Sequence, residues 1–203
     1  FIKENHYENF VDLVQYDVPI TAQILNRYKN FNERVSKNLK IKTVEFTSTK
    51  AVKPYVKPVF DLINKTYTEI YGFTKLTEDE MTEFAERFLP LLNPKLIKMI
   101  TDENGELLAF VIAMADLSEA IKNSRGRILP FGWARIFWAM KTSKRLQLLL
   151  GAIHPNYQNK GLDAVLATML FGSALKLGFK TVDSHLIMKD NLKMRGEIEK
   201  LDG

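Results

Sequence analysis

One stretch of the sequence, residues 146–188, restricts the fold more than any other part of the chain. Leu146 to Ile153 is an apolar run long enough to form a strand in the interior of a sheet. Gly161 to Leu177 then has the pattern of a strong helix, and Thr181 to Met188 has that of a second strand. A strand, a helix and a strand in this order indicate a β–α–β unit with helices packed on a sheet.

The remaining segments add strands and helices in an order that fits this unit. Strands are predicted at 39–47, 96–100 and 107–114, and helices at 20–35, 56–70, 77–92, 116–123, 130–140 and 190–201. Thr77 and Glu80 form a capping-box pattern, and Asn104-Gly105 predicts a hairpin with a type I′ turn. The expected fold class is α/β, a three-layer α/β/α sandwich with a central mixed β-sheet.

Composition excludes several classes of function. The chain has 203 residues and no cysteine, so disulfides, thiolate metal sites and cysteine nucleophiles are excluded, and no metal site is expected. The net charge is +5 without a block of basic residues, so nucleic acid is not an expected partner. Without an apolar run of about 18 residues or a leader, we expect no membrane partner and a cytoplasmic location. Because Phe1 is not a methionine, we expect the sequence to be a fragment.

The candidate ligand-binding segment is the loop between the apolar strand at 146–153 and the helix at 161–177. The strand ends at Pro155, a polar loop follows, and Gly161 opens the helix. This arrangement directs several backbone N–H groups outward at a helix N-terminus, where they suit a pyrophosphate. Gly161 allows a ligand to approach the backbone closely, so Gly161→Val is expected to abolish binding without unfolding the chain.

The same loop resembles the acetyl-CoA-binding motif of the GNAT superfamily of acyl-CoA N-acyltransferases, Arg/Gln-x-x-Gly-x-Gly/Ala. Gln158, Gly161 and the strand end Ile153-His154-Pro155 match the motif, whereas Asp163 departs from its last position. Asn191 to Met194 and Glu199 to Gly203 resemble the family's tail, Asn-x-x-Met…Glu-x-Leu-Gly. The resemblance covers about residues 40–203.

The resemblance implies a GNAT-like fold that binds acetyl-CoA as acyl donor without a metal. By position, the backbone of Ala152 and Ile153 would pair with the pantetheine arm. Gln158 would flank the phosphates, and Asn191 would lie at the acyl end. The pyrophosphate would be held by the amides of Asn159, Lys160, Gly161, Leu162 and Asp163.

The implied reaction is direct acyl transfer from acyl-CoA to an amine of an unknown acceptor. It needs a general base, for which His154 and Glu69 are the candidates and His185 a third. The alternative function is a catalytically degenerate GNAT-like domain with a structural or protein-interaction role. An Asp163 carboxylate that turns into the loop would favour this alternative, and one that turns to solvent would favour the enzyme. The oligomeric state does not follow from the sequence.

Each assignment also has a simpler interpretation. Residues 158–163 could form an ordinary strand-to-helix turn, and His154 could be an edge-of-strand residue. Tyr67 is expected to pack on its helix. Trp133, Phe137 and Trp138 could belong to the core, a domain interface, a pocket wall or an exposed partner surface. Residues 1–37 are interpreted as an extension, the remnant of a preceding GNAT-like domain in a tandem bacterial protein. Residues 38–203 are interpreted as the acyltransferase domain, lacking its last strands.

Overall fold

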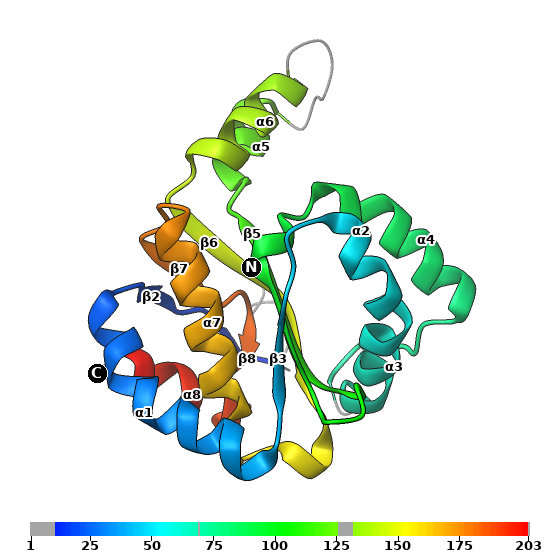
Figure 1. Cartoon of the computed structure of the whole chain (residues 1–203). Helices are drawn as coiled ribbons and strands as arrows, with labels where there is room; N and C mark the ends of the chain where they lie inside the picture. Colours follow the sequence, from blue (N-terminus) through cyan, green and yellow to red (C-terminus); the bar gives the residue numbers. More distant parts are fainter. Residues whose placement is uncertain (1–10, 69, 126–131, 203) are drawn as a thin grey trace, which may run out of the picture.

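The fold is built on a six-stranded sheet with the strand order β2-β7-β6-β5-β4-β3 (Figure 1). The computed structural model describes residues 11–68, 70–125 and 132–202. The strands are β2 (Asp17–Pro19), β3 (Lys42–Glu45), β4 (Ile97–Thr101), β5 (Leu107–Ala115), β6 (Arg145–Ile153) and β7 (Thr181–Asp183). Only β6 and β7 run parallel, so the sheet is mixed, as predicted.

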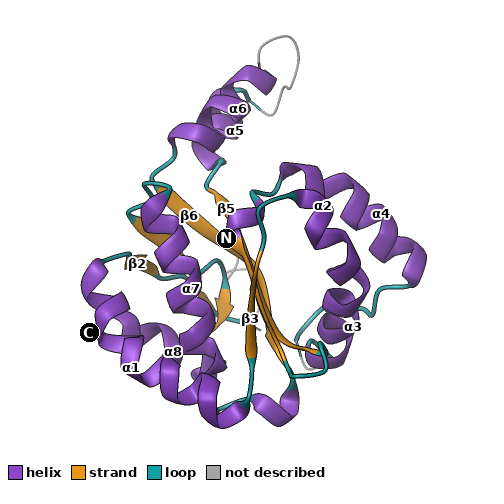
Figure 2. Cartoon of the chain, viewed as in Figure 1, coloured by secondary structure: helices purple, strands orange, loops and turns teal. Residues whose placement is uncertain are grey.

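Helices cover both faces of this sheet (Figure 2). One face carries α1 (Ala22–Leu39) and α7 (Leu162–Lys176), and α8 (Leu192–Asp202) contacts β2. The other face carries α2 (Thr49–Val52), α3 (Val56–Thr66) and α4 (Glu78–Phe88). Two more helices, α5 (Ser118–Asn123) and α6 (Gly132–Thr142), follow β5 and precede β6 along the chain. The predicted three-layer α/β/α sandwich is confirmed.

The N-terminal extension is part of this sheet. β2 pairs antiparallel with β7, placing Val18 opposite Val182, and β1 (Leu13–Val14) pairs with β8 (Ile187–Met188). α1 packs along α7 and buries Ile24 in the same core as Leu170. α7 therefore lies between the sheet and α1, which explains why its sequence is apolar on all sides. That residues 1–37 derive from a preceding domain stays a prediction.

Two local predictions need correction. The β4–β5 hairpin forms, but only Gly105 has a positive φ, of 89°, so the turn is not type I′, which needs two such residues. Instead, the Asp102 carboxylate accepts the N–H groups of Asn104 and Glu106 and holds the longer loop. The strand predicted at 181–188 is two strands, because the chain turns away from β6 after Asp183. The capping box of Thr77 and Glu80 is confirmed.

A lysine is buried beneath α7. Lys98 of β4 is 1% exposed, and its ammonium donates to the Glu45 carboxylate of β3 and to Ser173 Oγ of α7 at 2.7 Å. These contacts tie the edge strand β3 to the central strands and to α7. They also leave the lysine dependent on its partners, because an uncompensated buried charge is costly.

We expect Glu45→Ala to lower the free energy of unfolding by about 2 kcal/mol, because it leaves the buried ammonium of Lys98 with one hydroxyl partner. The value lies below that for a fully buried pair since the Glu45 side chain is 59% exposed. Lys98→Met should change stability by less than about 1 kcal/mol, and the double variant should match Lys98→Met. Urea denaturation measures all three. Equal losses for Glu45→Ala and Lys98→Met would contradict this account.

Candidate functional site

The two parallel strands separate after a short pairing. Arg145 to Gln147 pair with Thr181 to Asp183, and beyond them β6 continues to Ile153 with β5 as its partner. Asp183 ends the paired segment: its buried carboxylate binds the Gln15 amide and Arg145 Nη2 and accepts the N–H of His185 at 2.8 Å. His185, at φ 61°, then turns the chain towards β1. We call the opening between β6 (residues 148–153) and the chain after Asp183 the fork.

The backbone of β6 alternates between β5 and the fork. The N–H of His154 donates to the Leu108 carbonyl at 2.8 Å, so the hydrogen-bonded pairs with β5 fall on Ala152 and Leu150. The polar groups of Gly151 and Ile153 therefore face the fork. Two side chains bond to them: Tyr67 Oη donates to the Gly151 carbonyl at 2.8 Å and accepts its N–H at 3.3 Å, and Gln158 Nε2 donates to the Ile153 carbonyl at 3.4 Å.

This alternation bears on the two predicted pantetheine contacts. Ile153 faces the fork, as that role requires. Ala152 lies opposite Phe110, and its side chain is buried in the core below α3. By register, the backbone groups of Gly151 face the fork beside those of Ile153, whereas those of Ala152 face β5.

The loop after β6 presents backbone N–H groups next to the fork. A 3-10 turn at Pro155–Tyr157 leads to Asn159 at φ 59° and Gly161 at φ 87°, and α7 begins at Leu162. Within the described ranges the N–H groups of Asn159, Lys160 and Gly161 have no hydrogen-bond acceptor, and the first N–H groups of a helix have none inside it. Such a nest attracts anions. The Lys160 ammonium lies 5.1 Å from the ring centre of Tyr157, and Asp163 lies in the first turn of α7.

Gly161 is required by packing as well as by conformation. A Cβ atom at this position would lie 2.8 Å from the Phe31 ring and 3.0 Å from Val35, both on α1. We therefore expect Gly161→Val to destabilise the fold as well as the loop, because a side chain here strains the backbone and requires the Phe31 ring to shift.

The predicted bases have different surroundings. Both ring nitrogens of half-buried His154 are in contact, Nδ1 with the N–H of Asn156 at 3.2 Å and Nε2 with Lys65 Nζ at 2.6 Å. A base role for His154 would require Lys65 to move. Glu69 lies outside the described residues. His185 is exposed at the start of the fork, with its Nδ1 3.1 Å from the Gln147 amide.

Two further residues complete the site. Asn191 Oδ1 accepts the N–H of Met194 at 3.1 Å, so this residue caps α8. Tyr67, expected only to pack on its helix, reaches across to the free edge of β6, and nothing in the sequence pattern indicates this contact. Burial raises the pKa of the Tyr67 hydroxyl, and the N–H that Gly151 donates to this oxygen opposes part of that rise. The hydroxyl is therefore protonated at neutral pH.

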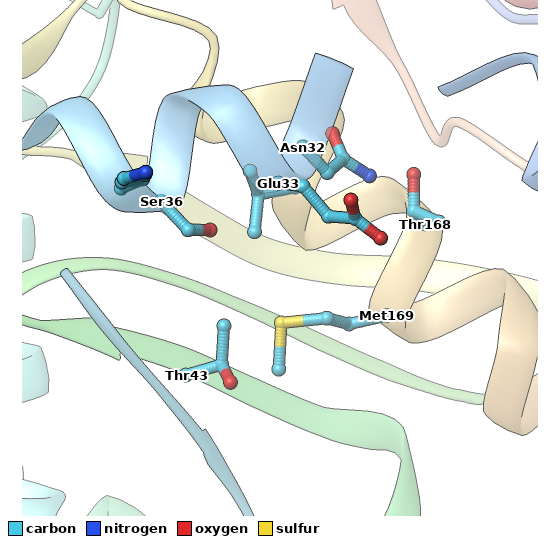
Figure 3. A pocket seen from close by; sticks show the side chains of 8 residues that line it. Asn32, Glu33, Ser36, Thr43, Thr168 and Met169 are labelled. Carbon is cyan, nitrogen blue, oxygen red and sulfur yellow. The ribbon is translucent and has the colours of Figure 1, made fainter. Parts of the chain in front are cut away.

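The hollow shown in Figure 3 is a separate feature. It has a volume of about 550 Å³ and lies between α1, α7 and β3, lined by polar residues such as Asn32, Glu33 and Thr168 together with Met169. β3 is at the opposite end of the sheet from β7 and β2, so the hollow does not open into the fork. Among the described residues, no three His, Asp or Glu side chains gather as metal ligands.

We expect Gly161→Ala to lower the free energy of unfolding by about 2 kcal/mol or more, because it combines a left-handed backbone with the contact to Phe31. Adding Phe31→Ala should cost less in this variant than in the parent chain, since it removes the clash. Gly172→Ala is the control on the same helix: no heavy atom lies within 4 Å of its Cβ position, and it should stabilise the chain slightly. Urea denaturation that ranks the two alanine variants equally would refute the role of Gly161.

Tyr67→Phe should cost about 1 kcal/mol at neutral pH, through the lost bonds to Gly151. Because the pKa of Tyr67 is raised in the folded state, its contribution is complete only at pH values well below 10, the ordinary pKa of a tyrosine. That contribution declines at higher pH, where the unfolded chain ionises first. The difference between parent and Tyr67→Phe should therefore shrink between pH 9 and 11, and thermal melts measure it, with Tyr55→Phe as the control. A difference that stays constant with pH would contradict burial of this hydroxyl.

The chain has distant relatives among characterised sequences. No family model matches it. It is 23% identical over 154 residues to the bacterial ceramide synthase of Caulobacter vibrioides (strain NA1000 / CB15N), a match that covers 73% of this chain and 40% of that protein. It is 25% identical over 148 residues to protein YghO of Escherichia coli (strain K12), covering 70% and 37%. The chain thus spans about two fifths of the length of these curated relatives.

Among solved structures, the chain is similar to the GCN5-related glucosamine N-acetyltransferase region of a fungal multi-domain GH3 β-N-acetylglucosaminidase. The two superpose with a TM-score of 0.52 over 97% of this chain and 20% of that one, at 8% sequence identity. The chain therefore has the fold of the GCN5-related N-acetyltransferases, the GNAT fold.

Proposed function

We propose that the chain binds an acyl-CoA in the fork and transfers its acyl group to an amine. The observation that carries this proposal is the free backbone edge of β6, which leads from Gly151 through Ile153 to the nest at the start of α7. An acyl-CoA has matching parts in the same order, an amide-bearing arm followed by a pyrophosphate.

Each part of the site has a role in this arrangement. The arm's amides pair with Gly151 and Ile153, displacing the Tyr67 and Gln158 side chains that now bond there. The pyrophosphate accepts the N–H groups of the loop from Asn159 to Leu162, with the Lys160 ammonium beside it. Binding in this way replaces the side-chain hydrogen bonds of Gly151 and Ile153 with hydrogen bonds to the ligand, so these backbone groups keep their partners.

The reaction needs positioning and proton transfer, and no covalent enzyme intermediate. The amine nitrogen attacks the thioester carbonyl carbon, a tetrahedral oxyanion forms, and the C–S bond breaks to release CoA thiolate. The nitrogen loses a proton and the thiolate gains one. His154 and Glu69 remain the proposed bases. The Tyr67 hydroxyl, which is protonated at neutral pH, is a proposed hydrogen-bond donor in the fork.

We further propose that the acceptor amine belongs to a lipid. The support is the name of one relative, a ceramide synthase, because ceramide contains an amide made from an acyl group and a lipid amine. A short donor, acetyl-CoA, is the expectation from the motif, and a long-chain acyl-CoA is the donor that a ceramide-like product would require.

Calorimetric titration with acetyl-CoA, palmitoyl-CoA and CoA tests the site. We expect micromolar binding that Lys160→Glu weakens about tenfold, because it reverses a charge beside the pyrophosphate. Lys176→Glu makes the same charge change at the other end of α7 and should leave the affinity within about twofold. Folded protein that binds no CoA ligand at about 1 mM would refute the proposal and favour the degenerate domain.

Mass spectrometry of the products tests the acceptor. With the donor that binds best, a long-chain amino alcohol should give the N-acyl amide, and a short polar amine should give little. Amide formed equally from both amines would contradict the lipid acceptor and leave acyl transfer intact.

A further inference from the structure

We propose that α5 and α6, the two helices of the connection at residues 116–144, dock on the surface of an anionic lipid bilayer. This proposal concerns a different part of the molecule from the fork and does not depend on acyl transfer. Figure 1 shows α5 and α6 standing away from the three layers, at the end of the sheet where β5 ends and β6 begins.

The outer face of α6 is aromatic. Trp133, Phe137 and Trp138 are 58%, 55% and 69% exposed, and Ile121 of α5 is 49% exposed. At 100° per residue, Trp133 and Phe137 fall in one row and Trp138 falls in the next, which gives one continuous face. The opposite side of α6, with Gly132 buried and Ile136 and Ala139 half-buried, packs against α5 and β5. Large aromatic side chains gathered on an exposed face mark an interaction surface.

The charge of the chain is concentrated in the same connection. Residues 116–144 hold six of the 29 basic residues and two of the 24 acidic ones, a net charge of +4 out of the total of +5. The rest of the chain is nearly balanced, with 23 basic and 22 acidic residues. One of the two acidic residues, Asp116, forms an ion pair with Arg145 of β6, with 3.7 Å between Asp116 Oδ2 and Arg145 Nη1. The basic side chains in the described part of the connection are those of Lys122, Arg125, Arg135, Lys141 and Lys144.

This combination selects one partner. Tryptophan and phenylalanine beside lysine and arginine are the composition of helices that lie in the membrane interface, and basic residues near such a surface bind anionic lipids. The Lys141 ammonium lies over the Phe137 ring, 4.5 Å from its centre, so a positive charge and the aromatic side chains share one face of α6. A protein or a second copy of the chain would need no excess of positive charge, so the observations favour the bilayer.

The proposal departs from the expectation that the chain has no membrane partner. That expectation rested on the lack of a spanning segment. Within the described residues, no helix is both long and apolar enough to cross a bilayer. An interfacial helix requires only one apolar face and therefore is compatible with that finding.

The sequence provides its own fluorescent reporter, because its two tryptophans, Trp133 and Trp138, both lie on α6. Vesicles of phosphatidylcholine with 30% phosphatidylglycerol (probe composition chosen from the expected surface charge) should shift the emission to the blue. Brominated lipids in the same vesicles should quench it. Pure phosphatidylcholine vesicles should bind about tenfold more weakly.

Vesicle co-sedimentation of variants separates the two components of the surface. Phe137→Ser with Trp138→Ser should lower the partition coefficient about tenfold, and Lys122→Glu with Lys141→Glu should do the same on anionic vesicles only. Leu91→Ser, at a 49% exposed apolar residue beside α4, and Lys29→Glu, on α1, are the matched controls and should bind like the parent. Circular dichroism checks that each variant is folded.

The overturning results are equally specific. The proposal would be refuted if the folded protein did not bind anionic vesicles. It would also be refuted if the control variants lost as much binding as the α5 and α6 variants. Self-association in analytical ultracentrifugation that Phe137→Ser with Trp138→Ser abolishes, without vesicle binding, would assign the face to a second copy of the chain.

Discussion

The carboxylate of Asp183 is the interaction on which the candidate site depends. It is buried at the point where β7 ends, and it gathers Gln15 from the N-terminal extension, Arg145 from β6 and the backbone of His185. Because it ends the parallel pairing after three residues, the rest of β6 keeps a free backbone edge. The amides of a ligand can form hydrogen bonds with that edge. It is free of a neighbouring strand because β7 ends at Asp183.

The extension and the site are also coupled through α1. Phe31 and Val35 pack on Gly161, the residue that begins α7 and shapes the anion-binding loop. The strand β2 pairs with β7 directly before the fork opens. Residues that the sequence pattern sets apart as an extension thus form part of the structural support of the loop. A substitution in α1 should therefore change the conformation of the anion-binding loop through packing, without any contact between α1 and a ligand.

Much of this arrangement follows from sequence pattern. The β–α–β unit, the hairpin and the capping box each have a local signal, because they depend on residues near one another in the chain. The strand break after Asp183 has none, since it depends on Gln15 and Arg145, which are distant in sequence. The contact of Tyr67 with Gly151 was missed for the same reason. The backbone direction of Gly151, Ala152 and Ile153 depends on register with β5, which residue type does not reveal.

The proposed roles share one geometry. β6 has nine residues, about 30 Å of extended chain, with the nest after its last residue and the α5–α6 connection before its first. A ligand lying along β6 with its phosphates in the nest would point its acyl end towards the end of the sheet from which α5 and α6 extend. The proposed lipid acceptor and the proposed bilayer surface are therefore on the same side of the site.

Amide hydrogen exchange measured by NMR, with and without CoA, tests the account at its centre. If the free edge of β6 and the nest bind the ligand, exchange should slow at Gly151, Ile153 and the amides from Asn159 to Leu162. Ala152, already paired with β5, should be unaffected. Saturating CoA that leaves Gly151 and Ile153 unchanged would show that the fork is not the ligand site.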